Sequence, residues 1–193
     1  MATSLKSRPV EAVPLPYPRQ PWIKWLYKSP ILLWRLGLGV LVGRLFMIMT
    51  TTGRKTGQPR HTAIEYHRFQ GRLMICSAWG AHSQWYKNLQ ADPRVTIQTS
   101  AGTQAMLARR LITEADLRLG YAHVMQNPTL QRWFRALGFD LTWEDFWARR
   151  STVYLLTFEP TDAPTPPGVH MDLAWAWGAL LILGVLVGWG RRR

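Results

Sequence analysis

Cysteine and catalytic motifs are scarce in this sequence. The 193 residues include one cysteine, Cys76, so no intrachain disulfide can form. The apolar residues around Cys76 predict that its small side chain is buried. The five histidines do not combine with cysteine or carboxylates at metal-ligand spacing, so we expect no metal site. A G-x-S-x-G serine-nucleophile motif is also absent. A domain with this inventory would need a cofactor to carry out demanding chemistry.

Acidic residues are also few, which leaves a strongly basic chain. Lysine and arginine number 24 against 11 aspartate and glutamate, a formal net charge of +13. Such a charge favours phosphate-bearing ligands, nucleic acid or an acidic lipid surface. No recognition helix or aromatic stacking strand supports nucleic acid, so we expect no such partner. With 47% hydrophobic and 18% charged residues, the composition argues against a disordered chain.

Proline content and hydropathy divide the chain into segments. Residues 1–21 are rich in proline and basic residues and predict a flexible arm, whereas residues 22–160 carry the signals of a folded domain. Residues 161–172 predict a proline-rich linker. Residues 173–190 are uncharged and rich in tryptophan, and they predict a single C-terminal transmembrane helix at the lower limit of length.

The folded segment combines short strands with helices. Residues 22–43 predict a helix in two pieces, broken near Ser29-Pro30, that either lies in a membrane interface or covers one end of the domain. Further helices are predicted over 83–90, after Thr113 and over 143–149. Strands are predicted over 45–51, 60–69, 72–77, 94–99, 104–111 and 153–158. Short antiparallel strands with flanking helices predict a mainly β, α+β domain, either a barrel or a sandwich.

A basic turn separates the first two strands. In Gly53-Arg54-Lys55-Thr56-Gly57, followed by Arg60, glycines let the backbone approach a ligand and cations suit phosphate or carboxylate groups. The spacing does not fit a Walker A loop, and Gly37-x-Gly39 does not fit the dinucleotide-binding fingerprint. An exposed basic hairpin without a ligand remains equally compatible with these residues.

Two sequence blocks resemble the deazaflavin-dependent nitroreductase family. The first runs from Met49 to Arg60, and the second is Trp85-Tyr86-x-Asn88-Leu89 with Asp92-Pro93-Arg94-Val95 after it and Ser77-x-Trp79-Gly80 before it. The resemblance covers about residues 29–160 and implies a six-stranded antiparallel split β-barrel related to FMN-binding barrels. It implies coenzyme F420, an 8-hydroxy-5-deazaflavin with a phosphate and an oligoglutamate tail, with FMN a weaker expectation. Family members pass a hydride to quinones, nitro compounds or activated alkenes.

The resemblance assigns roles to individual residues. Arg54, Lys55 and Arg60 would hold the phosphate and acidic tail, while Ser77 and Tyr86 are the candidate catalytic groups, with Tyr66 as another proton donor. Some relatives carry a lysine where this chain has Ala78 and a tyrosine where it has Glu65. The full set of cofactor-binding candidates is Thr52, Gly53, Arg54, Lys55, Thr56, Gly57, Arg60, Ser77, Ala78, Trp79, Trp85, Tyr86 and Asn88.

The expected activity is hydride transfer from the reduced coenzyme to a small organic acceptor. A membrane span suggests a lipid-soluble acceptor, membrane lipids as partners and a barrel on the cytoplasmic face of the cell membrane, as a monomer or homodimer. The three C-terminal arginines favour the opposite orientation, but no secretory signal precedes the barrel. A membrane-attached binding module for FMN, haem or a tetrapyrrole is the alternative. The helical aromatics are candidates either for a substrate lid or for core packing: Trp133, Phe134, Trp143 and Phe146.

Overall fold

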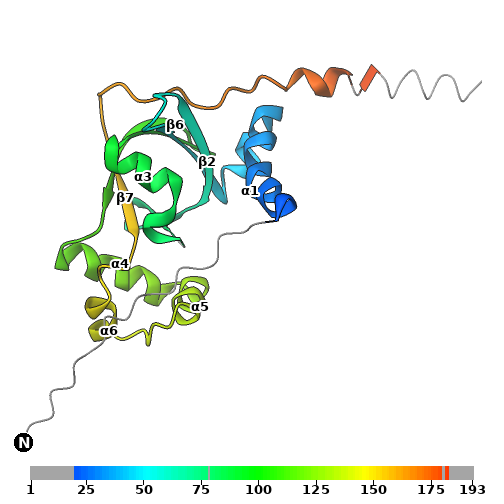
Figure 1. Cartoon of the computed structure of the whole chain (residues 1–193). Helices are drawn as coiled ribbons and strands as arrows, with labels where there is room; N and C mark the ends of the chain where they lie inside the picture. The colour runs from blue at the N-terminus through cyan, green and yellow to red at the C-terminus, as the bar shows by residue number, and fades with distance from the viewer. Residues whose placement is uncertain (1–19, 78, 180, 183–193) are drawn as a thin grey trace, which may run out of the picture.

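The computed structural model describes residues 20–77, 79–179 and 181–182, and its central feature is a strongly curved antiparallel sheet (Figure 1). The strand order is β2-β1-β5-β6-β7-β4-β3. Strands β2 and β3 follow each other in the chain but lie at opposite ends of this order, so the sheet curls until its two ends approach. The strands are β1 (Phe46–Thr52), β2 (Pro59–Glu65), β3 (His67–Phe69), β4 (Arg72–Cys76), β5 (Arg94–Thr99), β6 (Gly102–Arg110) and β7 (Leu155–Pro160).

The predicted α+β class is confirmed, whereas the predicted number of strands is wrong. The sheet has seven strands, because the single strand expected over 60–69 is divided at Tyr66 into β2 and β3. The Tyr66 hydroxyl donates to the carbonyl of Gly43 at 2.8 Å, just before β1. The chain therefore leaves one end of the sheet at Tyr66 and joins the other, a change of partner that a continuous apolar pattern does not reveal.

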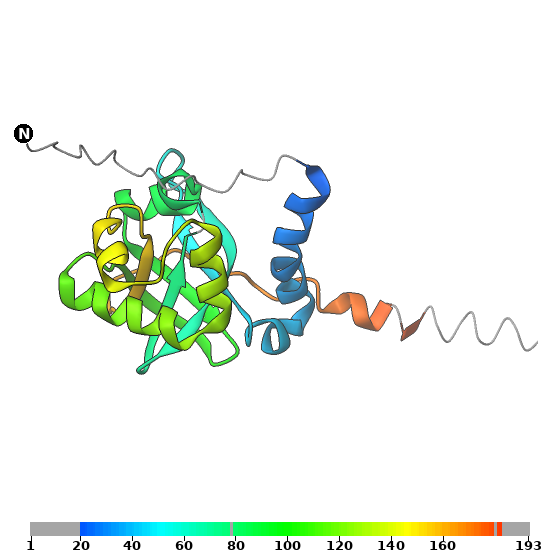
Figure 2. The same cartoon turned by 90° about the horizontal axis from the view of Figure 1, so that it is seen from below.

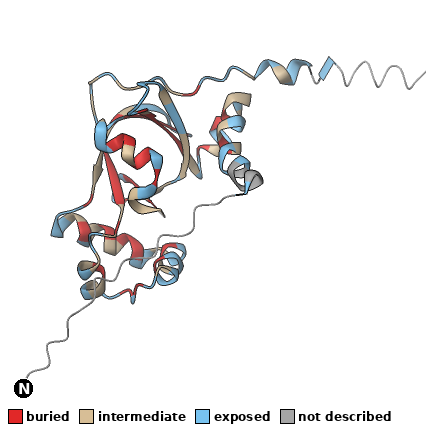
Figure 3. Cartoon of the chain, in the orientation of Figure 1, coloured by how far each residue is buried: buried red, intermediate tan, exposed pale blue. Residues whose placement is uncertain are grey.

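The barrel interior is filled from both the strands and one helix. Met47 and Met49 on β1 and Ile97 on β5 are fully buried there, as expected for alternate residues facing a core. Helix α3 (Gln84–Ala91) crosses one end of the barrel and adds Trp85, Tyr86 and Leu89 to the same core (Figures 1 and 3).

A group of helices forms a second, smaller core below the barrel. These helices are α4 (Glu114–Gln126), α5 (Pro128–Ala136) and α6 (Trp143–Ala148), and Figure 1 shows them together beneath β7. The side chains of Thr113, Asn127 and Thr142 accept hydrogen bonds from their first-turn amides, which explains where the three helices begin. Their apolar faces bury Phe134 and Phe146.

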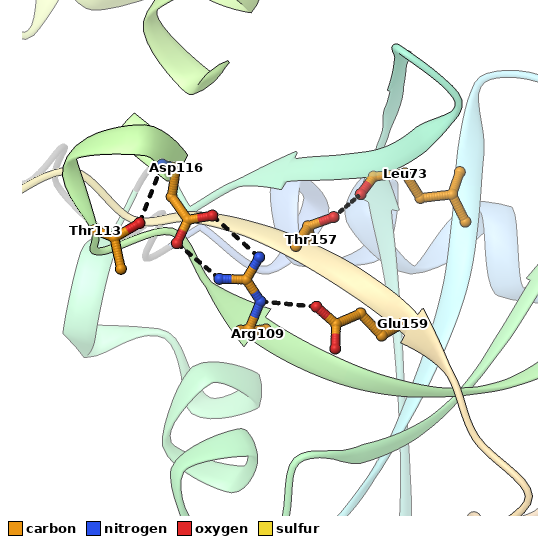
Figure 4. Close-up of polar contacts among 6 residues, drawn as sticks. All are labelled: Leu73, Arg109, Thr113, Asp116, Thr157 and Glu159. Atoms are coloured by element: carbon orange, nitrogen blue, oxygen red, sulfur yellow. Dashed lines mark hydrogen bonds and ion pairs between the residues drawn. The ribbon is translucent and has the colours of Figure 1, made fainter. Parts of the chain in front are cut away.

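An arginine joins this helical group to the sheet. Arg109 on β6 pairs with Asp116 on α4 at 2.7 Å and with Glu159 on β7 at 2.9 Å (Figure 4). The guanidinium holds the pKa of Asp116 below its usual range. Beside it, the Thr157 hydroxyl donates to the Leu73 carbonyl at 3.1 Å, an additional bond between β7 and β4.

The N-terminal helical segment lies on the outside of the barrel. It comprises α1 (Pro21–Leu33), a π-helical turn η1 (Trp34–Leu38) and α2 (Gly39–Val42). The break expected near Ser29-Pro30 is wrong: α1 continues through Pro30, and the irregularity falls at Gly37, whose φ is 86°. A proline removes one helical hydrogen bond, whereas a positive φ redirects the backbone, so the glycine sets the bend.

The expected proline-rich linker is bound along the barrel wall. The side-chain amide of Gln98 donates to the Val169 carbonyl at 3.0 Å and accepts from its N–H at 2.6 Å. Further along, Arg35 forms a bidentate ion pair with Asp172 at 2.8 and 2.7 Å. The Trp177 indole then donates to the Leu36 carbonyl at 2.7 Å. The C-terminal tail therefore leaves the barrel beside η1, as Figure 2 shows.

The predicted transmembrane helix is only partly within the described residues. The tail is helical over 175–179 and at 181–182, while residues 180 and 183–190 of the expected span and residues 1–19 of the N-terminal arm lie outside the described part. Across the residues that are described, no helix combines the length and apolar character needed to cross a bilayer.

Candidate functional site

The split of the barrel contains a cleft of about 470 Å³. It lies along β2 and the segment that follows β4, with α1 forming one wall. This volume falls within the usual range of small-molecule sites, roughly 300–1,000 Å³. The lining residues are Tyr27, Lys28, Ile31, Phe46, His61, Thr62, Ala63, Ile64, Glu65, Cys76, Ser77, Trp79, Ser83, Gln84 and Trp85.

An aromatic contact connects α1 to the opposite wall of the cleft. The rings of Tyr27 and Trp79 meet edge to face, with centroids 5.8 Å apart and planes at 85°. Edge-to-face contacts are favourable because a positive ring edge meets a negative ring face. This contact spans the split between the helix and the loop after β4.

Ser77 is held in the loop after β4 by several hydrogen bonds. Its backbone N–H donates to the Tyr154 carbonyl at 2.9 Å, and its hydroxyl lies 3.2 Å from the Gly80 carbonyl and 2.9 Å from the Ser83 hydroxyl. Gly80 adopts a φ of 51°, and a Cβ there would meet the Tyr154 ring at 3.0 Å. The predicted site residue Ser77 thus lines the cleft in a fixed position, together with Trp79 and Trp85.

The basic turn predicted from the sequence is a compact hairpin loop between β1 and β2. The Gly53 N–H donates to the Gln58 carbonyl at 2.9 Å, and the Gly57 N–H donates to the Gly53 carbonyl at 2.7 Å. Gly57 has a φ of 67°, a conformation that glycine adopts without steric cost. Thr56 adds a contact at 3.4 Å from its hydroxyl to the Arg60 guanidinium.

Arg54 differs from its basic neighbours because its side chain is bound to α3. Its guanidinium donates to Asn88 Oδ1 and to Gln84 Oε1, both at 3.0 Å. Lys55 and Arg60 are exposed, and neither forms an ion pair with any described residue. Gln84 also lines the cleft, so the hairpin and the cleft adjoin through α3.

Asn88 is the buried anchor of this arrangement. It is 5% exposed, accepts two hydrogen bonds from Arg54 and donates from Nδ2 to the Thr51 hydroxyl at 3.1 Å. Thr52, at the end of β1, is half-buried next to Gly53. The predicted cofactor-binding residues on the hairpin and on α3 are therefore brought together, although Asn88 acts through Arg54 and does not line the cleft.

The predicted proton donors Tyr86 and Tyr66 both make their contacts outside the cleft, and their proton-donor roles stay predictions. Tyr86 is 7% exposed and lies edge-on against Tyr154 in the barrel core, with ring centroids 5.1 Å apart. Tyr66 donates to the Gly43 carbonyl, as described above. Neither lines the cleft in the described part of the chain. Their chain neighbours Trp85 and Glu65 line the cleft instead, because successive side chains of a helix or strand point in different directions. Ala78, also a predicted site residue, lies outside the described residues.

The helical aromatics proposed as a lid do not line this cleft. Phe134 and Phe146 are buried in the lower core at 2% and 1% exposure, which favours the core-packing alternative for both. Trp143 is partly buried against the same core, and Trp133 is 44% exposed.

Several cleft residues were not anticipated from the sequence. Tyr27, Lys28 and Ile31 come from α1, which precedes the recognised blocks, and His61 comes from the exposed side of β2. Only the closure of the barrel and the position of α1 bring them to the cleft. A local motif could not have found them, because the contacts join segments that no short pattern connects.

Two ionisable groups of the cleft are driven toward their neutral forms. Burial, together with the nearby His170, lowers the pKa of His61, whose Nδ1 lies 2.9 Å from the Thr50 hydroxyl. Burial raises the pKa of the Cys76 thiol to about 12, so it stays protonated near neutral pH and is a poor nucleophile. The cleft is therefore suited to holding a ring system more than to supplying a charged nucleophile.

Comparison with known proteins identifies the family. A family model described as F420H(2)-dependent quinone reductase matches residues 37–136, which include the basic hairpin, the Ser77 loop and α3. F420H(2)-dependent quinone reductases from two Mycobacterium tuberculosis strains are 39% identical over 54 residues, covering 26% of this chain and 36% of each relative. The chain thus matches about a third of the length of these relatives.

Solved structures with a similar arrangement come from several kinds of protein. An F420-H2 dependent reductase (FDR-A) is 21% identical over 60% of this chain and 95% of its own, with a TM-score of 0.44. A heme binding protein from Mycobacterium smegmatis is 14% identical over 72% of this chain and 57% of its own, with a TM-score of 0.41. Because the family model spans more than half of the 193 residues, this chain belongs to the F420H(2)-dependent quinone reductase family.

Proposed function

We propose that this chain passes a hydride from reduced coenzyme F420 to an organic acceptor of the quinone type. Family membership supports this proposal, and the observation that carries it is the cleft in the barrel split beside an exposed cationic hairpin. A ring system fits the cleft, while phosphate and carboxylate groups fit the hairpin. One ligand that combines a flat ring with several negative charges would engage both.

The residues present fit a deazaflavin coenzyme. Trp79 and Trp85 provide aromatic walls, and Ser77 and Ser83 provide neutral hydroxyls, so the ring would be held without a charged nucleophile. Lys55 and Arg60 would bind the phosphate and acidic tail, since no described carboxylate neutralises them. When bound, the reduced coenzyme supplies the hydride, which is the chemistry that these side chains lack.

The contribution of the protein is binding, orientation and exclusion of water. A ring bound between the Tyr27–Trp79 contact and Trp85 would displace water from the cleft. The Ser77 hydroxyl donates to the Gly80 carbonyl, which leaves the Ser83 hydroxyl, 2.9 Å away, as the group of this pair that can donate to a carbonyl oxygen of the acceptor. Correct placement of two reacting molecules removes much of the entropic barrier to their reaction.

A lipid-soluble acceptor and membrane attachment belong to the same proposal. Large apolar side chains are exposed on both α1–α2 and the C-terminal tail, which lie on one side of the barrel (Figures 2 and 3). In the sequence, the apolar run continues to residue 190 and ends in three arginines, a combination suited to an acidic bilayer surface. The exposed apolar residues are Trp25, Leu32, Leu33, Val40, Leu41, Trp175, Trp177, Leu181 and Ile182.

Coenzyme binding is the first test of the proposed function. Titration of the purified protein with oxidised coenzyme F420, followed by fluorescence, should give saturable binding that is tighter than binding of FMN. Binding of FMN, haem or a tetrapyrrole without any F420 binding would contradict the proposal. Flotation with vesicles of neutral and acidic lipid tests the attachment separately, and recovery of all protein away from both kinds of vesicle would contradict it.

A further inference from the structure

Lys28 on α1 lies at the cleft although α1 precedes the segment matched by the family model. The match begins at residue 37, whereas Lys28 belongs to the helix that covers the barrel split. The neighbouring Tyr27 ring contacts Trp79, which fixes this part of α1 against the loop after β4. Lys28 therefore reaches the cleft from a helix that lies mostly outside the family motifs.

The charge distribution in the cleft makes Lys28 distinctive. Among the described lining residues, His61 and Cys76 are driven toward their neutral forms, and Lys28 is the only lysine or arginine. Position 78, between the lining residues Ser77 and Trp79, is an alanine, so this loop carries no cation there. Lys28 thus carries the one formal positive charge among the described residues of the cleft wall.

The Lys28 ammonium group is free to bind a ligand. The described part of the chain offers it no hydrogen-bond or ion-pair partner. Glu65, the acidic residue of the same cleft, does not pair with it: its carboxylate is 60% exposed and lies 3.9 Å from His67. A flexible, unpaired lysine at the edge of an aromatic cleft is well suited to an anionic oxygen on a ring.

We propose that Lys28 binds the ionised hydroxyl of the deazaflavin ring and thereby helps to select this coenzyme over a flavin. This inference rests on the proposed function, because it requires the ring to occupy the cleft. The phosphate and acidic tail have Lys55 and Arg60 on the hairpin, which leaves the ring hydroxyl for Lys28. FMN carries a methyl group in place of this hydroxyl, so Lys28 would add nothing to its binding.

The ionisation of the bound coenzyme provides a direct test. Ionisation of a hydroxyl conjugated to a chromophore shifts its visible absorption, so the midpoint can be followed by pH titration of the complex. In the full-length protein, the bound hydroxyl should ionise about one pH unit lower in the wild type than in Lys28→Gln, as a nearby opposite charge requires. Lys28→Arg should restore most of this difference, and Arg132→Gln, which removes an exposed charge on α5, should leave the midpoint unchanged.

The outcomes separate this inference from the proposed function. If the wild type binds coenzyme F420 and Lys28→Gln shows the same midpoint and the same affinity, the role assigned to Lys28 is wrong while the function stands. If the wild type binds no F420, the proposed function fails, and the Lys28 inference fails with it. Weaker F420 binding in Lys28→Gln with unchanged FMN binding would add support, whereas equal weakening of both would contradict selection by the ring hydroxyl.

Discussion

Arg54 donates two hydrogen bonds to the same oxygen of Asn88, one from its backbone N–H at 3.3 Å and one from its guanidinium at 3.0 Å. This joins the basic hairpin to α3, and the buried Asn88 extends the connection to Thr51 on β1. One residue of the recognised motif is therefore engaged in shaping the loop, which leaves Lys55 and Arg60 to meet a ligand.

The first prediction concerns this anchor. Asn88→Ala should destabilise the protein by about 1–3 kcal/mol, because it removes the acceptor for Arg54 and the donor for Thr51 in a buried setting. It should also weaken coenzyme binding, since the hairpin loses its fixed position. Urea unfolding and fluorescence titration measure the two effects. Unchanged binding by the folded variant would show that the hairpin does not depend on Asn88.

The second prediction distinguishes the three hairpin cations. Lys55→Gln and Arg60→Gln should weaken F420 binding with little effect on stability, because both side chains are exposed and neither is bonded to another described helix or strand. Arg54→Gln should weaken F420 binding and also lower stability, because its guanidinium donates hydrogen bonds to Asn88 and Gln84 on α3. Binding measured over a range of salt concentrations provides the readout, and the salt dependence should be smaller in the first two variants. If Arg132→Gln weakens binding equally, net charge alone would explain the effect.

The third prediction tests whether the lower helices form a core or a lid. Phe146 is 1% exposed among aromatic neighbours, so Phe146→Ala should cost about 3–5 kcal/mol of unfolding free energy. Trp133→Ala, at an exposed position on α5, should change stability much less. Thermal and urea unfolding compare the two. A large loss of acceptor affinity with intact stability in Phe146→Ala would instead favour the lid.

The fourth prediction concerns pH. Burial, with a contribution from His67, lowers the pKa of His123, and its Nε2 has no hydrogen-bond partner in the described part of the chain. A depressed pKa means that the unfolded state takes up a proton first as the pH falls. The stability contributed by neutral His123 is thus fully present above about pH 6.5 and declines below it.

Unfolding by urea between pH 5 and pH 8 measures this dependence. The wild type should lose stability more steeply below pH 6.5 than His123→Gln, although His61, which has the same direction of shift, leaves some dependence in both. Identical slopes for the two proteins would exclude His123 as a source of the pH dependence.

Much of the fold and part of the site could be predicted from the sequence. Turn residues and alternating apolar residues mark the strands, and the glycines and cations of residues 53–60 mark the hairpin. These features depend on neighbours in the chain. The division of one expected strand at Tyr66 depends on barrel closure, and the binding of the linker by Gln98 depends on contacts with residues far along the chain.

The same distinction explains which site residues were missed. Lys28 carries no local signal of binding, because only the packing of α1 over the split brings it to the cleft. Tyr86 has the opposite problem: it belongs to a recognisable motif, yet the helical rotation of α3 directs it into the barrel core. A motif identifies the segment near a ligand, while side-chain direction decides which of its residues face the ligand.

The most direct test of the central claim is hydride transfer itself. Reduced coenzyme F420 is mixed with a quinone in the presence and absence of the full-length protein, and the return of the oxidised coenzyme is followed by its visible absorption. We predict quinone-dependent oxidation that is fast with the wild type and slow with Lys55→Gln at subsaturating coenzyme. Oxidation no faster than in the protein-free mixture, with the coenzyme shown to be bound, would contradict the account.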